Sequence, residues 1–205
     1  MTETSSVPSV FLQSAAGGRL KMPALAQPRM IVDEFLTWAE GKEGRWELLD
    51  GEPVAMSPER VIHALTKGQA FVALKNAIAL AEAPCRAFPD GATVRISGRT
   101  AFEPDALVHC GPPLPPDAIE IPDPVIVVEV LSDRTAARDH GAKLEGYFSL
   151  PSVVHYLILD PDTRRMIHHK RGRGDIIETR LLRDAALRLD PPGLELSVRD
   201  MFPPP

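Results

Sequence analysis

The chain has 205 residues, of which 44% are hydrophobic and 25% are charged. This length and composition suit one globular domain with a substantial core. The formal net charge is −5, whereas proteins that bind nucleic acid tightly and without sequence preference usually carry a basic surplus, because neutralising phosphates supplies much of their affinity. The net charge therefore argues against a strongly basic nucleic-acid binder, although 23 Lys and Arg residues are available for a local basic patch.

The two ends of the chain are predicted to lie outside the folded domain. Residues 1–28 are rich in Ser, Ala, Gly and Pro, which predicts a flexible tail. They lack the basic region and apolar run of a signal peptide, and no stretch of the chain approaches the ~18 apolar residues of a membrane helix. We therefore expect a cytoplasmic protein with no membrane partner. Residues 201–205 are expected to be a second loose end, which leaves a domain over residues 29–200.

The two cysteines, Cys85 and Cys110, are far apart in the sequence. They form no Cys-x-x-Cys motif, so neither a disulfide framework nor a zinc site is indicated. The pattern predicts two free thiols, which is the usual state of cysteines in a reducing cytosol.

The chain after the tail is predicted to begin with a helix and a β-hairpin. Residues 30–40 place Met30, Phe35 and Trp38 on one face of a short helix. Strands are expected at about 45–49 and 52–56. Asp50-Gly51 lies between them and is a strong hairpin signal, because glycine accepts the positive φ of a tight turn.

A longer helix and two short strands are expected next. The helix spans residues 60–82 and stops before Pro84. Strands follow near 85–88 and 92–96, with Pro89-Asp90-Gly91 as the turn between them. The apolar residues expected on the buried face of the helix are Ile62, Leu65, Phe71, Leu74 and Ile78.

The second half of the chain is predicted to supply the central strands. A short strand begins at Asp105, and residues 125–132 (VIVVEVLS) resemble a strand buried on both faces. A helix is expected over 135–150 with Thr135 near its N-cap, then a buried strand over 153–160 and a hairpin around residues 172–174. The order predicts an α/β (α+β) fold, in which helices flank a central mixed β-sheet.

Glu129 is the residue that is hardest to explain by folding alone. It interrupts a continuous apolar run, and burying a carboxylate there without a partner or cation would be costly. Asp105 starts a strand 24 residues earlier, and two acids on neighbouring strands can share a hard cation such as Mg²⁺, which prefers oxygen ligands. The alternatives are that Glu129 faces water from an edge strand and that Asp105 is a turn residue after proline.

The helix after Glu129 carries one stripe of polar residues at a spacing of four: Asp139, Lys143 and Tyr147. A lysine beside a metal-activated water can hold the attacking group or stabilise charge in the transition state. The spacing alone favours another interpretation, in which Asp139 and Lys143 form a surface ion pair. Tyr147 is expected more often to pack in the core than to take part in chemistry.

Two further residues could approach the same place. Glu47, on the first strand of the hairpin, could supply a third carboxylate. His63 lies early in the long helix and could also reach the site. A single histidine at such a position more often serves packing or faces the solvent.

Three segments together resemble the Uma-two family of restriction endonucleases, which belongs to the PD-(D/E)XK nuclease-like superfamily. They are RWELLDGEPVAMSP with a following His, then EPDALV, and then the long run from VIVVEVLS to YLILDP. The resemblance covers roughly residues 30–200. It implies a restriction-endonuclease-like core with an N-terminal helix and β-hairpin.

The resemblance also implies roles for individual residues. Asp105 and Glu129 correspond to the two metal ligands of the superfamily motif, and Glu47 corresponds to an early glutamate of the family. The usual lysine position holds Leu131 instead, and the family is expected to use a lysine on the next helix, which is Lys143. Asp139, Tyr147 and His63 are supporting candidates. The chain departs from the family pattern at Ser132-Asp133-Arg134-Thr135 and at Tyr156-Leu157.

These observations favour an endonuclease that depends on Mg²⁺ or Mn²⁺ and hydrolyses phosphodiester bonds of nucleic acid, with DNA as the expected substrate. A homodimer is also expected, because cutting both strands of a duplex commonly takes two sites. Two alternatives remain. One is a nuclease-fold module with weak or lost catalysis that binds nucleic acid or a protein partner. The other is a metal-dependent hydrolase of another phosphate ester.

Overall fold

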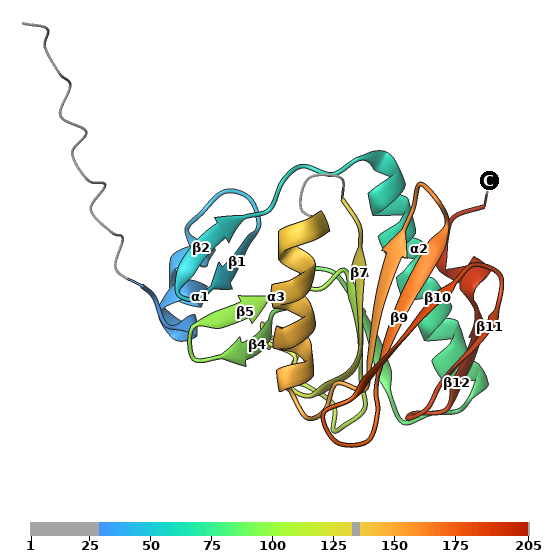
Figure 1. Cartoon of the computed structure of the whole chain (residues 1–205). Helices are drawn as coiled ribbons and strands as arrows, with labels where there is room; N and C mark the ends of the chain where they lie inside the picture. Colours follow the sequence, from blue (N-terminus) through green and yellow to red (C-terminus); the bar gives the residue numbers. More distant parts are fainter. Residues whose placement is uncertain (1–28, 133–135, 205) are drawn as a thin grey trace, which may run out of the picture.

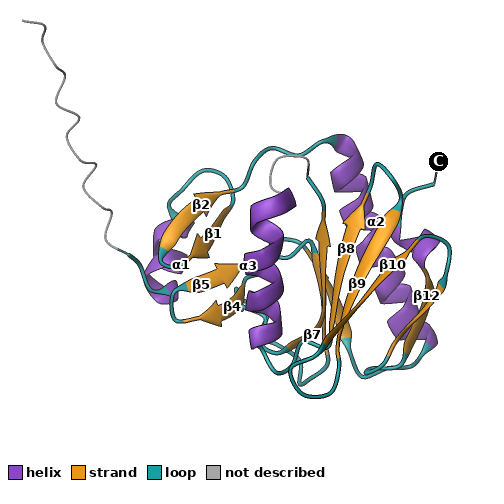
Figure 2. Ribbon diagram, viewed as in Figure 1, coloured by secondary structure: helices purple, strands orange, loops and turns teal. Residues whose placement is uncertain are grey.

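The computed structural model describes residues 29–132 and 136–204, and it describes only the backbone of residues 136–140. Within these ranges the chain forms a large β-sheet between two helices, with a smaller sheet beside it (Figure 1; Figure 2). This is the mixed α+β architecture that the sequence predicts. The tail predicted over residues 1–28 and the N-cap role predicted for Thr135 lie outside the described residues.

The helices are α1 (Val32–Glu40), α2 (Val61–Leu80), α3 (Ala136–Ser149) and a short 3₁₀ helix, η1 (Val198–Met201). The strands in the first half of the chain are β1 (Trp46–Leu49), β2 (Glu52–Ala55), β3 (Arg86–Pro89), β4 (Val94–Ser97), β5 (Thr100–Phe102) and β6 (Ala106–His109). The later strands are β7 (Pro124–Val130), β8 (His155–Asp160), β9 (Arg165–Arg171), β10 (Ile177–Leu182), β11 (Ala186–Leu189) and β12 (Leu194–Ser197).

The large sheet has six strands in the order β10-β9-β8-β7-β6-β3. Only β7 and β8 are parallel, and α3 connects them. A parallel pair needs such a crossover, because the chain must return to the same end of the sheet before the second strand begins. The predicted hairpin around residues 172–174 is confirmed as the antiparallel pair β9–β10.

Alternation along the strands divides the core between the two faces of this sheet. On one face, Ile126 and Val128 of β7 pack with α2, with the β11–β12 hairpin and with η1. On the other face, Val127 packs with Tyr147 and Leu144 of α3 and with the smaller sheet. Both faces of the central strands are covered, which explains why β7 and β8 have nearly continuous apolar sequences.

The smaller sheet has the order β2-β1-β5-β4, and α1 packs on it through Val32 and Phe35. Its β1–β2 hairpin confirms the predicted turn, since Asp50 and Gly51 both have positive φ, 50° and 83°. This turn keeps Glu47 paired with Val54 in the hairpin. The hairpin therefore holds Glu47 in a fixed position beside the large sheet.

The strands predicted near 85–88 and 92–96 are confirmed as β3 and β4, but they belong to different sheets. The strands β3 and β4 do not form a hairpin: β3 pairs with β6 in the large sheet, and β4 pairs with β5 in the small one.

The predicted buried face of α2 is confirmed for Leu74, which is buried, and for Ile62, Phe71 and Ile78, which are partly buried. Leu65 is the exception, because it is 53% exposed whereas Lys67 is buried. Apolar residues lie on all sides of α2, so their spacing could not exclude Leu65 from the buried face.

The end of the chain also differs from the prediction. The sequence did not predict β11, β12 or η1, which follow the β9–β10 hairpin. Met201 and Phe202, assigned to a loose C-terminal end, are buried in the core beside α2. Because their side chains belong to the core, the folded part of the chain extends past residue 200.

Cys85 and Cys110 form a disulfide, which corrects the prediction of two free thiols. They directly flank the paired residues Arg86 and His109 of β3 and β6, and their Cα atoms are 4.1 Å apart. The sequence carries no signal for this bond, because the two cysteines are far apart along the chain and meet only through the pairing of β3 with β6. The bond joins the edge strand β3 to the strand that begins next to Asp105.

We expect the disulfide to stabilise the domain. It closes a loop with a sequence separation of 25 residues, and cross-links of this size add about 3 kcal/mol by restricting the unfolded chain. Urea unfolding of the protein carrying both Cys85→Ser and Cys110→Ser should show a loss of that size. A reducing agent should destabilise the wild type and leave the double variant unchanged; equal effects on both would contradict the assignment.

None of the helices in the described part of the chain is long and apolar enough to cross a membrane.

Candidate active site

Asp105 and Glu129 are brought together at one end of the large sheet, where β6 begins and β7 ends. Ala106 pairs with Val128 in the β6–β7 register, so Asp105 and Glu129 are cross-strand neighbours. The backbone N–H of Asp105 donates to the carbonyl of Val128 at 3.0 Å, and the N–H of Val130 donates to Asp105 Oδ2 at 2.6 Å. These bonds fix the Asp105 carboxylate at the strand end.

Lys143, on α3, lies between two of the predicted carboxylates. Its Nζ is 2.9 Å from Glu47 Oε1 and 3.0 Å from Glu129 Oε1. Tyr147, one turn later on α3, donates its hydroxyl proton to the same Glu129 oxygen at 2.7 Å. The helix thus presents both polar groups to Glu129. Because β7 lies between β8 and β6, the alternative in which Glu129 faces water from an edge strand is excluded.

Burial and charge shift the pKa values of this group. Burial raises the pKa of Glu129 to about 8, with Asp105 and Glu47 adding to the rise and Lys143 and Tyr147 opposing it. Burial alone would lower the pKa of Lys143, but the carboxylates of Glu129 and Glu47 raise it well above its usual value. Lys143 is therefore an ammonium ion at neutral pH, which suits it to donate hydrogen bonds rather than to act as a base.

Asp105 has its own lysine, Lys67 of α2, which the sequence analysis did not single out. Lys67 Nζ is 2.6 Å from Asp105 Oδ1 and 3.6 Å from Asp90 Oδ2, and it also hydrogen-bonds Glu59. Burial raises the pKa of Asp105, although Lys67 and the Val130 N–H oppose the rise. The pKa of Lys67 is raised too, because its carboxylate partners outweigh the effect of its burial.

Arg45 joins these two groups into one network. Its guanidinium binds Asp90 at 2.7 Å and Glu103 at 2.6 Å, while the Glu103 backbone N–H donates to Glu47 Oε1 at 2.9 Å. The network holds six carboxylates and three cations, so three negative charges are uncompensated when every group is ionised. The carboxylates are Glu47, Glu59, Asp90, Glu103, Asp105 and Glu129; the cations are Arg45, Lys67 and Lys143.

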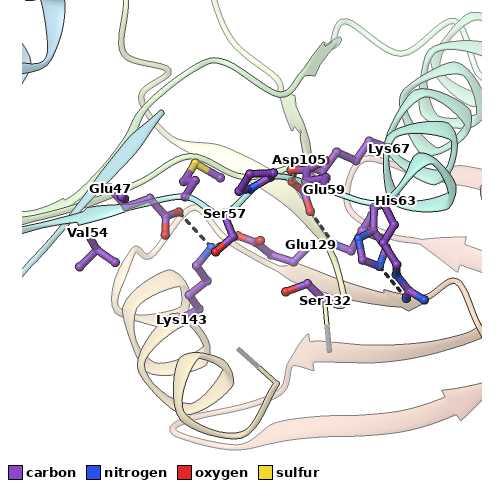
Figure 3. A pocket seen from close by; sticks show the side chains of 15 residues that line it. Glu47, Val54, Ser57, Glu59, His63, Lys67, Asp105, Glu129, Ser132 and Lys143 are labelled. Carbon is purple, nitrogen blue, oxygen red and sulfur yellow. Dashed lines mark hydrogen bonds and ion pairs between the residues drawn. The ribbon is translucent and has the colours of Figure 1, made fainter. Parts of the chain in front are cut away.

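The network opens into a pocket of about 350 Å³ (Figure 3). Glu47, Lys67, Asp105, Glu129 and Lys143 all line it. The lining also includes residues of the hairpin and of the segment that leads into α2: Val54, Ala55, Met56, Ser57 and Pro58. The pocket therefore combines charged and apolar lining residues.

Of the supporting candidates His63, Tyr147 and Asp139, the structure places the side chains of the first two. His63 is buried and lines the pocket, and Arg60 donates to its Nε2 at 3.0 Å. Tyr147 is fully buried, so it packs in the core as expected and also binds Glu129. Asp139 is on α3, but its side chain lies outside the described residues. Lys143 is not on the surface, as an ion pair with Asp139 would require. It is buried between Glu47 and Glu129.

The donor chemistry of the pocket fits a magnesium ion. In the described part of the chain, no three His, Cys, Asp or Glu side chains converge closely enough to form a metal site by themselves. Mg²⁺ is usually held by only one or two carboxylates and keeps several waters. Asp105 and Glu129 supply two neighbouring carboxylates, and the uncompensated negative charge of the network would attract a cation. Glu47, the third predicted ligand, contacts Lys143 at 2.9 Å, as Glu129 does at 3.0 Å.

Comparisons with known proteins agree with this architecture. The model of the Uma2 (Uma-two) family, described as "Putative restriction endonuclease", matches residues 32–199. The chain therefore belongs to this nuclease-like family. An uncharacterized protein of Synechocystis sp. is 26% identical over 178 residues, which cover 86% of this chain and 93% of the relative.

A solved structure shares the fold. It is a crystal structure from Anabaena variabilis, described as "a putative nuclease belonging to DUF820". It superposes with a TM-score of 0.67 at 19% identity, covering 84% of this chain and 97% of that chain. At this level of identity the likeness establishes the fold alone.

Proposed function

We propose that this protein is an endonuclease that depends on Mg²⁺ or Mn²⁺ and hydrolyses phosphodiester bonds of nucleic acid, with DNA as the substrate. The observation that carries the proposal is the convergence of Asp105, Glu129 and Lys143 in one pocket, from β6, β7 and α3. Two neighbouring carboxylates can hold a divalent ion, and a lysine ammonium beside them can stabilise the charge that develops on a phosphate during metal-assisted hydrolysis. Membership of a family described as restriction endonucleases supports the same reaction.

In this proposal Asp105 and Glu129 hold the metal ion, which when bound would polarise the phosphate and lower the pKa of an attacking water. Lys143 donates a hydrogen bond to the phosphate oxygen on which negative charge develops. Tyr147 keeps Glu129 in place through its 2.7 Å hydrogen bond. Glu47, also predicted as a metal ligand, orients the Lys143 ammonium through its 2.9 Å ion pair.

Calorimetric titration with Mn²⁺ tests the metal site. We expect the wild type to bind Mn²⁺ and both Asp105→Asn and Glu129→Gln to lose binding at least tenfold, as about 1.4 kcal/mol of lost ligand interaction would produce. Glu178→Gln is a matched control, because Glu178 is an exposed carboxylate on β10. If the wild type binds no divalent ion at millimolar concentration, the proposed mechanism has no basis.

A second candidate function is a nuclease-fold module that binds a partner without cutting. The net charge of −5 favours it, together with the way both pocket lysines are already paired with carboxylates. Nicking of supercoiled plasmid in the presence of Mg²⁺ or Mn²⁺ separates the two functions. Cleavage that disappears in Asp105→Asn supports the enzyme; metal binding without cleavage of DNA or RNA supports the module.

A further inference from the structure

Lys67 is a buried ammonium that the proposed reaction leaves without a role. Its side chain extends from the second turn of α2 and is only 8% exposed. Its Nζ contacts three carboxylates: those of Asp105, Glu59 and Asp90. Burying a charged group is costly unless it is paired, so these carboxylates determine where the ammonium lies.

The contact with Asp105 places Lys67 where a metal ion would also bind. Lys67 Nζ is 2.6 Å from Asp105 Oδ1, while Asp105 Oδ2 accepts the Val130 N–H. A magnesium ion binds a carboxylate oxygen at about 2.1 Å. An ammonium and a divalent cation at the same oxygen would repel each other strongly, because little water separates them in this buried position.

The structure also provides an alternative place for the ammonium. Beside the main pocket is a second recess of about 200 Å³, lined by Glu59, Lys67, Asp90 and Asp105 among others. Glu59 already binds Lys67, and Asp90 lies 3.6 Å away. The side chains of Glu59 and Asp90 are 28% and 35% exposed, against 6% for Asp105. A small movement of Nζ toward the more exposed acids would leave Asp105 while keeping Lys67 paired.

We propose that Lys67 is an internal counter-ion that competes with a divalent cation for Asp105, and that metal binding moves its ammonium onto Glu59 and Asp90. Lys67 thereby keeps the Asp105 carboxylate paired in the metal-free protein and lowers the affinity for metal. Glu59 acts as a positioning residue, since it receives the displaced ammonium. The inference rests on the proposed metal site of Asp105 and Glu129.

Mn²⁺ titration of a double-mutant cycle tests this competition. We expect Lys67→Gln to bind Mn²⁺ about tenfold more tightly than the wild type, a coupling of ordinary size between two sites. Glu59→Gln should weaken binding in the wild type, because the displaced ammonium loses its acceptor. The same change made on top of Lys67→Gln should have almost no effect. A purely long-range charge effect would make the two changes additive.

Controls separate this inference from the proposed function. Lys75→Gln removes an exposed lysine from the same helix and should leave the affinity unchanged. If the wild type binds Mn²⁺ and Asp105→Asn abolishes binding, the metal site stands. Additive effects in the cycle, or an unchanged or weaker affinity of Lys67→Gln, would then overturn the competition alone. Absence of binding to the wild type would overturn both.

A measurement on the wild type avoids the effect of substitutions on folding. A crystal structure with Mn²⁺ bound should show Lys67 Nζ hydrogen-bonded to Glu59 or Asp90 and withdrawn from Asp105. Mn²⁺ bound at Asp105 while Lys67 Nζ still lies within about 3 Å of Oδ1, at hydrogen-bond distance, would contradict the proposal.

Discussion

Replacing Lys143 by glutamine is expected to slow metal-dependent plasmid cleavage by about 10²–10³-fold, the usual loss when one preorganised donor to the transition state is removed. The ammonium of Lys143 is buried between Glu47 and Glu129, and their carboxylates raise its pKa. It therefore meets the phosphate as a positive charge. Glutamine keeps a hydrogen-bond donor of similar length but removes this charge.

Initial rates of nicking, measured across several Mg²⁺ concentrations, check the expectation. Lys75→Gln is the matched control for the loss of one lysine charge and should cleave as the wild type does. Because removing one partner of a buried ion pair also destabilises a protein, circular dichroism must show that Lys143→Gln is folded at the assay temperature. Equal cleavage by wild type and folded variant would identify a contaminant or a different donor.

The sequence predicted that the carboxylate of Glu129 is buried and needs a partner, but it did not identify that partner. Glu129 was identified because a carboxylate in a buried strand needs a partner, and the structure supplies Lys143 and Tyr147. The partnership itself could not be derived from spacing. The spacing alone favours an ion pair between Lys143 and Asp139, four residues earlier. Only the crossover connection of β7, α3 and β8 brings the helix over the end of its own strand.

Lys67 shows a limit of periodicity arguments. It lies in a helix that has apolar residues on all sides, so the spacing favoured a face containing Leu65 as the buried one. The structure exposes Leu65 and buries Lys67, because Lys67 pairs with Asp105 across the helix–sheet interface. The preference of one charged residue for a distant partner leaves no periodic signal. The disulfide could not be predicted for the same reason: Cys85 and Cys110 are distant in the sequence and meet only through the β3–β6 pairing.

The domain is expected to lose stability in mild acid because of a second buried pair, His155 and His168. These residues lie on β8 and β9, on the face of the sheet away from α3, and are 0% and 3% exposed. His155 Nε2 is 3.1 Å from the carbonyl oxygen of Pro191, to which it must donate. Its Nδ1, 2.9 Å from His168 Nε2, therefore accepts a hydrogen bond from the Nε2–H of His168 when both rings are neutral.

Adding a proton to either of these two histidine rings is unfavourable in the folded state. Protonating His155 Nδ1 would set two N–H groups against each other, and His168 Nδ1 is buried with no hydrogen-bond partner among the described residues. Burial, assisted by nearby positive charge, lowers the pKa of His155 from 6.5 to about 3 and that of His168 from 6.5 to about 4. The folded state therefore keeps both rings neutral at pH values where the unfolded chain is protonated.

The sign of the effect follows from proton uptake on unfolding. Between the folded values near 3 and 4 and the unfolded value of 6.5, the unfolded chain binds more protons, so the free energy of unfolding falls as the pH falls. The stabilising effect is complete above pH 6.5. Below that value, each histidine lowers the free energy of unfolding by about 1.4 kcal/mol per pH unit. The two histidines together should therefore lower it by about 3–4 kcal/mol at pH 5.

Urea unfolding at pH 7 and pH 5 measures this loss, and comparison with His168→Gln isolates the contribution of the pair from those of the carboxylates. The variant removes one titrating ring, so its loss of stability between the two pH values should be about half that of the wild type. His169→Gln is the matched control, because His169 is the next residue of β9 and is only partly buried. If His168→Gln and the wild type lose the same free energy on acidification, the buried pair does not determine the acid sensitivity of this fold.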